Sequence, residues 1–182
     1  MNTQNLIEPI NESAKLEESF ALIVDLVDKP EDIRLDWLKD HNWAAVPVEG
    51  ACHFNEYDAD NLAKALSFIN CHSCLAVATE PLKNSTLCYK VKTTKEGLLA
   101  FSWECGSFDF VIISEDKTFA IMCTVNDYYV VAGQRDFVTV AVGGSILEAR
   151  QKFLHFIQDD SWENKTKKHL LEVFHRYENF NG

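Results

Sequence analysis

The feature that most constrains the fold is a succession of six short apolar runs between residues 75 and 132. Taken together, the runs are rich in β-branched and aromatic side chains, which favour strands. The polar stretches 114–117 and 125–127 resemble hairpin loops, and sequential hairpins form an antiparallel meander. The expected strands cover residues 75–79, 87–92, 98–103, 108–113, 118–123 and 128–132.

Helical periodicity precedes these runs. Leu16, Phe20, Ile23 and Val27 are spaced four, three and four residues apart, as on one face of a helix. Pro30 is well tolerated in the first turn of a helix, so a second helix is expected to begin there. The helices expected before the strands cover residues 12–27, about 30–41, and 58–69.

Two more helices are expected after the strands. Ser145 and Glu148 have the spacing of a capping box, in which each side chain satisfies the other residue's backbone amide. The expected helices cover residues 146–157 and about 162–177, whereas residues 134–142 fit neither the helical nor the strand pattern. Because 47% of the 182 residues are hydrophobic, one core can form. We therefore predict a single α+β domain over residues 1–182, with an antiparallel meander sheet of about five or six strands flanked by N-terminal and C-terminal helices.

The formal net charge is −11, and the negative charge is concentrated near the N-terminus. Residues 1–70 contain 14 acidic and 5 basic residues, whereas residues 71–182 contain 14 and 12. A negative surface repels phosphate backbones and anionic lipids and attracts cationic surfaces. We therefore expect no direct binding to nucleic acid or membranes, and a basic protein as the partner.

The acidic residues of the second expected helix recur at a helical spacing. Asp32, Asp36 and Asp40 lie four residues apart, which would place them on one helix face. One interpretation is a solvated face, and the alternative is a surface that docks a basic partner. Aromatic residues beside the acids could anchor such an interface or belong to the core. The predicted partner-binding residues are Asp25, Asp28, Glu31, Asp32, Asp36, Trp37, Asp40 and Trp43.

A cluster of cysteines and histidines is the alternative site. The stretch CHSC, residues 71–74, holds two thiols and an imidazole, but zinc sites usually combine two such pairs. Because an apolar strand pattern begins at Cys74, the main interpretation is a core position for that thiol, with a zinc site or a redox pair as alternatives. A zinc-binding domain or small enzyme built here would use Cys52, His53, Cys71, His72 and Cys74.

Catalytic and targeting signatures are absent from the sequence. It contains no G-x-S-x-G, H-E-x-x-H, G-x-G-x-x-G or P-loop motif, so we predict no enzymatic activity and no cofactor. The N-terminus has no basic region followed by an apolar stretch, and no apolar run approaches the roughly 18 residues of a membrane helix. We therefore expect a cytosolic protein with reduced cysteines.

An acidic α+β domain of this kind, without a catalytic motif, resembles the immunity proteins that bacteria keep beside secreted or contact-delivered toxins, including those of contact-dependent inhibition and polymorphic-toxin systems. The resemblance covers composition and general architecture, without a matching family motif. It implies a protein that binds a basic toxin domain, often a nuclease, and neutralises it through the acidic N-terminal face. A regulatory adaptor that binds a folded partner remains an alternative.

Overall fold

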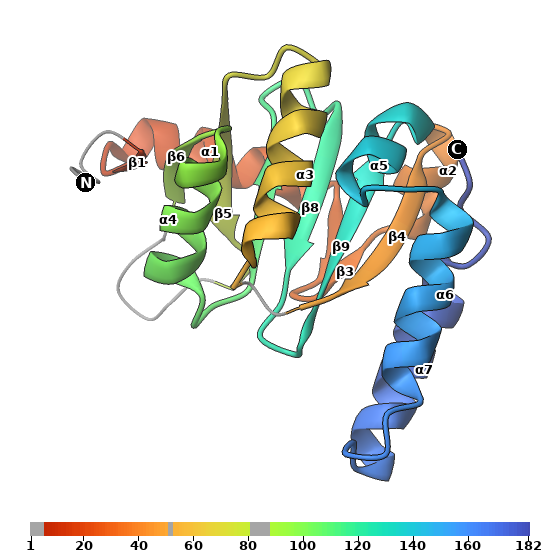
Figure 1. Ribbon diagram of the computed structural model, residues 1–182. Helices are drawn as coiled ribbons and strands as arrows, with labels where there is room; N and C mark the ends of the chain where they lie inside the picture. The colour runs from red at the N-terminus through yellow and green to blue at the C-terminus, as the bar shows by residue number, and fades with distance from the viewer. Residues whose placement is uncertain (1–5, 51–52, 81–87) are drawn as a thin grey trace.

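The computed structural model describes residues 6–50, 53–80 and 88–182, and it centres on a seven-stranded sheet (Figure 1). The strands are β1 (Ile7–Pro9), β4 (Ala44–Glu49), β5 (Ser73–Ala78), β6 (Cys88–Lys92), β7 (Phe110–Ile113), β8 (Phe119–Cys123) and β9 (Tyr128–Gly133). Their order is β1-β6-β5-β7-β8-β9-β4, and all neighbours are antiparallel. The predicted α+β class is confirmed, with a sheet larger than the expected five or six strands.

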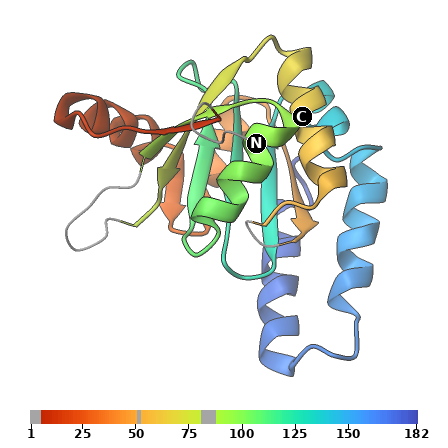
Figure 2. The same cartoon turned by 60° about the vertical axis from the view of Figure 1, so that its left-hand side comes forward.

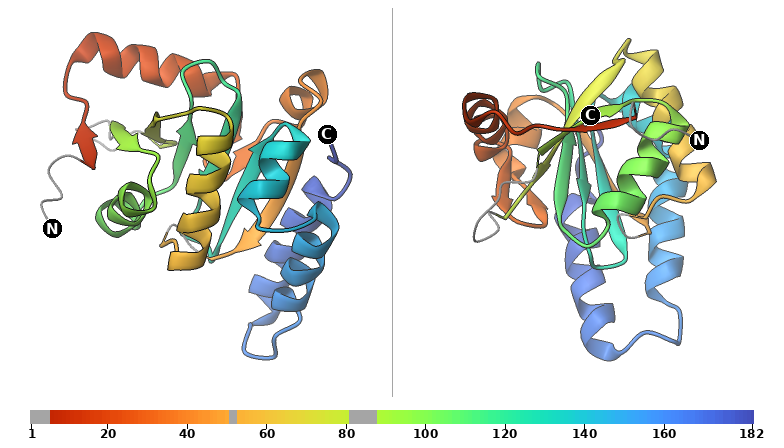
Figure 3. Two further views of the ribbon diagram at one scale, coloured as in Figure 1. Left: turned by 45° about the horizontal axis from the view of Figure 1, so that its top comes forward. Right: turned by 90° about the vertical axis from the view of Figure 1, so that its left-hand side faces the viewer.

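Helices cover both faces of this sheet. They are α1 (Ser13–Val24), α2 (Leu35–Asp40), α3 (Glu56–Phe68), α4 (Lys95–Cys105), α5 (Arg135–Ala141), α6 (Ile146–Ile157) and α7 (Asn164–Tyr177). In Figure 1, α3, α4 and α5 lie in front of the sheet, and Figures 2 and 3 show α1 and α7 on the opposite face. Within the described part of the chain, none of these helices is long and apolar enough to cross a membrane.

The central strands are buried on both faces, which explains why they read as continuous apolar runs. Phe110 and Ile112 of β7 point into the core beneath α3, α4 and α5. Val111 and Ile113 alternate with them and point into the core beneath α1 and α7. Five of the six strands expected from the sequence are confirmed, as β5 to β9.

The predicted capping box is present at the start of α6. The Ser145 hydroxyl accepts a hydrogen bond from the Glu148 amide at 3.2 Å, and the Glu148 carboxylate accepts one from the Ser145 amide at 3.0 Å. The helices expected at 12–27, 58–69, 146–157 and 162–177 are confirmed with small shifts in their ends. The ambiguous stretch 134–142 forms α5.

The strand expected at residues 98–103 is wrong, because this stretch lies within α4. The Thr94 hydroxyl accepts a hydrogen bond from the Gly97 amide at 3.2 Å and caps the helix. Leu98, Phe101 and Cys105 are then buried at spacings of three and four residues. The helix packs closely on the end of β6, since a Cβ atom at Gly97 would clash with the carbonyl oxygen of Lys92.

The helix expected at about 30–41 is confirmed only over residues 35–40, as α2, and its expected start at Pro30 is wrong. Residues before α2 form a separate antiparallel hairpin of β2 (Val27–Lys29) and β3 (Asp32–Ile33), with Pro30 in its turn. The Ile33 amide donates to the hydroxyl of Tyr177 at 3.0 Å, and the Arg34 amide donates to the carbonyl of Leu26 at 2.8 Å. These tertiary bonds replace the helical ones, so Asp32 lies in β3 and not on α2, which carries Asp36 and Asp40. The hairpin lies between α1 and α7.

The edge strand β4, which the sequence patterns did not predict, is covered by the last residues of the chain. The Ala45 amide donates to the carbonyl oxygen of Phe180 at 3.1 Å. The buried guanidinium of Arg150 on α6 donates to the carbonyl oxygens of Ala45, Tyr177 and Phe180 at 2.7 to 3.1 Å. It therefore fastens the C-terminal residues and α6 to a strand edge that would otherwise be open to pairing.

Candidate functional site

A pocket of about 470 Å³ lies between the β2–β3 hairpin and α7, at the end of the sheet where β5 stops and β7 starts. We call it the acidic pocket, because five carboxylates line it. Four of its lining residues come from α7 with helical spacing, so one stripe of that helix forms a wall. The lining residues are Lys29, Pro30, Glu31, Asp32, Glu80, Asp109, His169, Glu172, Val173 and Arg176.

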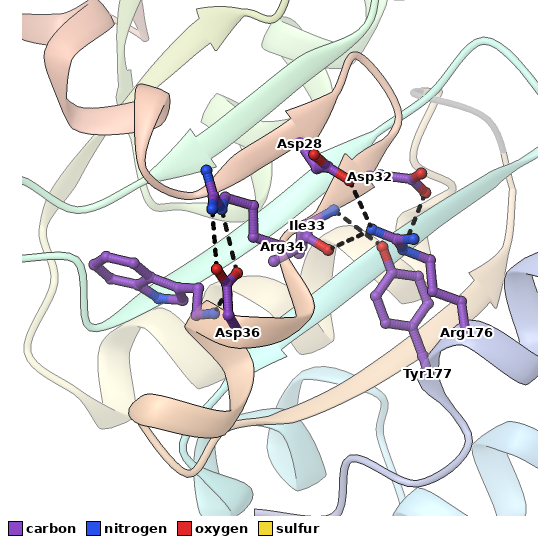
Figure 4. A network of polar contacts seen from close by, with 8 residues as sticks. Asp28, Asp32, Ile33, Arg34, Asp36, Arg176 and Tyr177 are labelled. Atoms are coloured by element: carbon purple, nitrogen blue, oxygen red, sulfur yellow. Dashed lines mark hydrogen bonds and ion pairs between the residues drawn. The ribbon is translucent and has the colours of Figure 1, made fainter.

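One side of the acidic pocket is neutralised by Arg176 (Figure 4). Its guanidinium lies 3.3 Å from the Asp32 carboxylate and 3.7 Å from that of Asp28, and it donates to the carbonyl oxygen of Ile33 at 3.2 Å. The side chains of Arg176 and Asp32 are only 22% and 18% exposed, respectively. The ion pairs therefore lie partly out of water and are less screened than surface pairs.

The next residue of α7 joins the hairpin to the core. Tyr177 is fully buried, and its hydroxyl accepts the hydrogen bond from the Ile33 amide (Figure 4). Burial is the main cause that raises the pKa of the Tyr177 hydroxyl to about 12. The phenol therefore stays neutral and holds β3 against α7.

The opposite side of the acidic pocket holds Glu31, Glu80 and Asp109, and no lysine or arginine among the described residues forms an ion pair with them. Burial, with the charges of Glu31 and Glu80 as further causes, raises the pKa of the Asp109 carboxyl. A hydrogen bond of 2.8 Å from the Val125 amide to Asp109 Oδ1 acts in the opposite direction. Among the described residues, no ion pair involves Asp109. This side therefore crowds carboxylates together, which favours a bound cation.

Glu31 connects the hairpin to strand β9 and to α7. The buried Tyr128 hydroxyl donates to Glu31 Oε2 at 3.4 Å, and His169 Nε2 lies 3.6 Å from the same oxygen. The rings of Tyr128 and His169 are 5.9 Å apart. Burial raises the pKa of the Tyr128 hydroxyl. Tyr128 therefore acts as a hydrogen-bond donor that orients the Glu31 carboxylate.

The predicted acidic residues are divided between two places. Glu31 and Asp32 line the acidic pocket, and Asp28 contacts it through Arg176. The other acids lie away from it, so the expected continuous stripe does not form. Asp25 lies 3.8 Å from Lys117, Asp36 pairs with Arg34 at 2.9 Å, and Asp40 ends α2 at the surface.

Asp36 and Asp32 were both predicted to face a partner, but each is paired with an arginine of this chain. The hydrogen bond from Arg34 lowers the pKa of the exposed Asp36 carboxyl to about 2. Asp36 therefore remains charged but is engaged within its own helix terminus. Asp32 belongs to β3 and faces Arg176, so its charge is used inside the fold.

The two predicted tryptophan anchors lie largely within the protein. Trp43 is 3% exposed and packs in the core beneath α1 and α7, so the structure does not present it to a partner. Trp37 is half-buried, stacks on His41 with ring centroids 3.9 Å apart, and lies beneath Lys117. Both residues thus support the fold around α2.

The cysteine and histidine residues predicted as an alternative site do not lie together. One of them, Cys52, lies outside the described residues. The Thr93 hydroxyl, just before α4, donates to the Cys71 carbonyl, whereas His53 contacts Trp103 and Gly106 at the end of that helix. The eleven residues of α4 separate these points by about 16 Å.

The individual side chains at residues 71–74 also fit structural roles. Cys74 is buried in β5, and burial raises the pKa of its thiol. Cys71 is half-buried and its thiol donates to the Ser73 carbonyl, whereas His72 is exposed. Within residues 6–50, 53–80 and 88–182, no group of three or more Cys, His, Asp or Glu residues is placed to hold a metal ion.

Several lining residues of the acidic pocket were missed in the sequence. Glu80 follows β5 and Asp109 precedes β7. Only the pairing of these two strands brings the two residues together. His169, Glu172 and Arg176 share one stripe of α7, and their spacing of three and four residues was a visible signal.

Comparisons with protein-family models, curated proteins and solved structures found no match.

Proposed function

We propose that this chain is a cytoplasmic binding protein that captures a basic segment of a protein partner in the acidic pocket. The biological setting we propose is bacterial toxin immunity, in which the partner is a basic toxin domain. The observation that carries the proposal is the crowding of Glu31, Glu80 and Asp109 on one side of the acidic pocket.

A guanidinium or ammonium group suits this arrangement for two reasons. It would relieve the repulsion between carboxylates, and its donors could bridge two of them at once. The opposite wall is already neutralised by Arg176. The remaining negative charge of the pocket is therefore on the side of Glu31, Glu80 and Asp109, with which no lysine or arginine of the described residues forms an ion pair. The net charge of −11 would speed the approach of a basic partner.

The test begins by capturing partners from cells that produce the protein and measuring the affinity of each purified basic partner. Glu80→Gln/Asp109→Asn removes two pocket charges. Asp36→Asn/Asp40→Asn removes two charges from α2. Glu104→Gln/Glu163→Gln removes two exposed charges elsewhere and serves as the matched control. All three variants change the net charge equally, so general steering is the same.

The pocket variant is expected to weaken binding about tenfold or more, as expected for lost charge pairs that are partly desolvated. The control should remain within about twofold of the original protein. Equal binding by the pocket variant and the control would sink the assignment of the pocket. A stronger effect of the α2 variant would instead favour the surface expected from the sequence.

A second measurement separates immunity from a regulatory adaptor. Adding the protein to its partner at equal concentration should abolish the partner's toxic activity if it is an immunity protein. An adaptor would bind without such inhibition. The pocket variant supplies the internal control, since its weaker binding should restore the activity at matched concentrations.

A further inference from the structure

We infer that the partner segment presents an apolar side chain beside its basic one, because an apolar groove adjoins the acidic pocket. This inference rests on the proposed function and specifies its ligand. The groove has a volume of about 460 Å³. Its apolar and uncharged lining consists of Phe20, Ile23, Val24, Val27, Pro30 and Thr79.

The groove is formed by one stripe of α1 and the hairpin beside it. Ile23 and Val24 lie three and four residues after Phe20, so the three side chains share one face of α1. Val24 is 65% exposed, although it is apolar and lies next to other apolar residues. Phe20, Val27 and Pro30 are half-buried and Ile23 is buried, so Val24 is the apolar side chain of the groove most open to a partner.

The apolar groove and the acidic pocket share two structural elements. Lys29 and Pro30, at the turn of the hairpin, line both recesses. Thr79 lines the groove, and its amide and hydroxyl donate to the carbonyl oxygen of Asp109 at 3.0 and 3.3 Å. The carboxylate of that aspartate lines the pocket. A single segment lying across the hairpin turn could therefore reach both recesses.

The charges around the groove decide what can occupy it. Asp28 and the cation Lys29 line the groove. Asp25 follows α1, and the five carboxylates of the acidic pocket lie on the other side of the turn, so negative groups outnumber the lysine. Anionic lipids and acidic peptides would be repelled by these groups. The arrangement fits a protein segment in which arginine or lysine is close to an aliphatic residue such as leucine.

The test uses three fluorescein-labelled peptides of equal length and fluorescence anisotropy with the full chain. The first peptide alternates arginine and leucine, the second has serine in place of leucine, and the third has serine in place of arginine. The arginine–leucine peptide is expected to bind at least about tenfold more tightly than either other peptide, because only it fills both recesses.

Two matched variants locate the apolar contact. Val24→Ser should weaken binding of the arginine–leucine peptide about fivefold, because it removes part of the groove surface. Leu147→Ser, at a similarly exposed position on α6, should leave it unchanged. Neither position is buried, so both variants are expected to fold.

The outcomes separate this inference from the proposed function. Equal binding of the arginine–leucine and arginine–serine peptides, or equal effects of the two serine variants, would overturn the apolar contact and leave the acidic pocket standing. Failure of both arginine peptides to bind would overturn the proposed function and this inference together.

Discussion

The guanidinium of Arg176 lies 3.3 Å from the carboxylate of Asp32, although the two residues are far apart in the chain. Together with the hydrogen bond that the Ile33 amide donates to the Tyr177 hydroxyl, this pair joins α7 to the β2–β3 hairpin. The same contacts build one wall of the acidic pocket. Stability and site geometry are therefore coupled at this point.

Replacing Arg176 with methionine is expected to lower the free energy of unfolding by about 2 kcal/mol. The change leaves the partly buried carboxylate of Asp32 without its cation. The loss is smaller than for a fully buried ion pair, because this pair is partly exposed. Urea unfolding measures the loss. Arg34→Met, which breaks an exposed pair with Asp36, should cost clearly less, because water screens that pair. Equal losses in the two variants would contradict the structural role of Arg176.

Replacing Arg150 with methionine is expected to lower the free energy of unfolding by about 3 kcal/mol. The buried carbonyl oxygens of Ala45, Tyr177 and Phe180 lose their charged donor. Hydrogen exchange at the Ala45 amide should become faster, since that amide pairs with Phe180. Arg135→Met, at an exposed position that contacts Asn181, is the control and should have a smaller effect. Unchanged exchange at Ala45 would argue against a fastening role.

The free energy of unfolding is expected to fall as pH rises from about 4 to 6, because of the raised pKa of Asp58. Burial raises its pKa from 3.8 to about 6, so in this interval the folded protein keeps a proton that the unfolded chain has lost. After allowance for its partial exposure, the change is about 1 kcal/mol. Urea unfolding across this range should show a flatter profile for Asp58→Asn. Asp60→Asn, which affects a carboxyl with a lowered pKa, should retain this contribution.

Binding of a basic peptide is expected to strengthen as pH rises through the raised pKa of Asp109. The protonated carboxyl cannot attract a cation, whereas the carboxylate can. Fluorescence anisotropy between pH 4.5 and 7.5 measures the change. Asp109→Asn should remove part of the pH dependence and weaken binding at pH 7.5. Identical profiles for the two proteins would exclude Asp109 from the binding site.

Replacing Ser145 with alanine is expected to lower the free energy of unfolding by about 1 kcal/mol, the usual effect of losing a helix cap. The variant removes one half of the capping box at the start of α6. Ser107→Ala, at an exposed loop position, is the matched control and should stay within about 0.5 kcal/mol. Thermal unfolding of both variants checks the difference.

Local patterns were sufficient for much of the fold. The short apolar runs predict β5 to β9, and Ser145 with Glu148 predicts the start of α6, because these signals depend on residues close together in the chain. The same kind of signal failed at residues 98–103, where β-branched or aromatic preference was outweighed by the cap at Thr94 and the helical burial pattern of α4.

The sequence by itself determined the α+β class and the concentration of acid near the N-terminus. Only the tertiary structure decided which acids gather in a pocket, since Asp32 is held by Arg176 and Glu80 meets Asp109 through the pairing of β5 with β7. Residue spacing reports neighbours along one helix or strand. It carries no information about contacts between distant segments, where packing and hydrogen bonding place the charges.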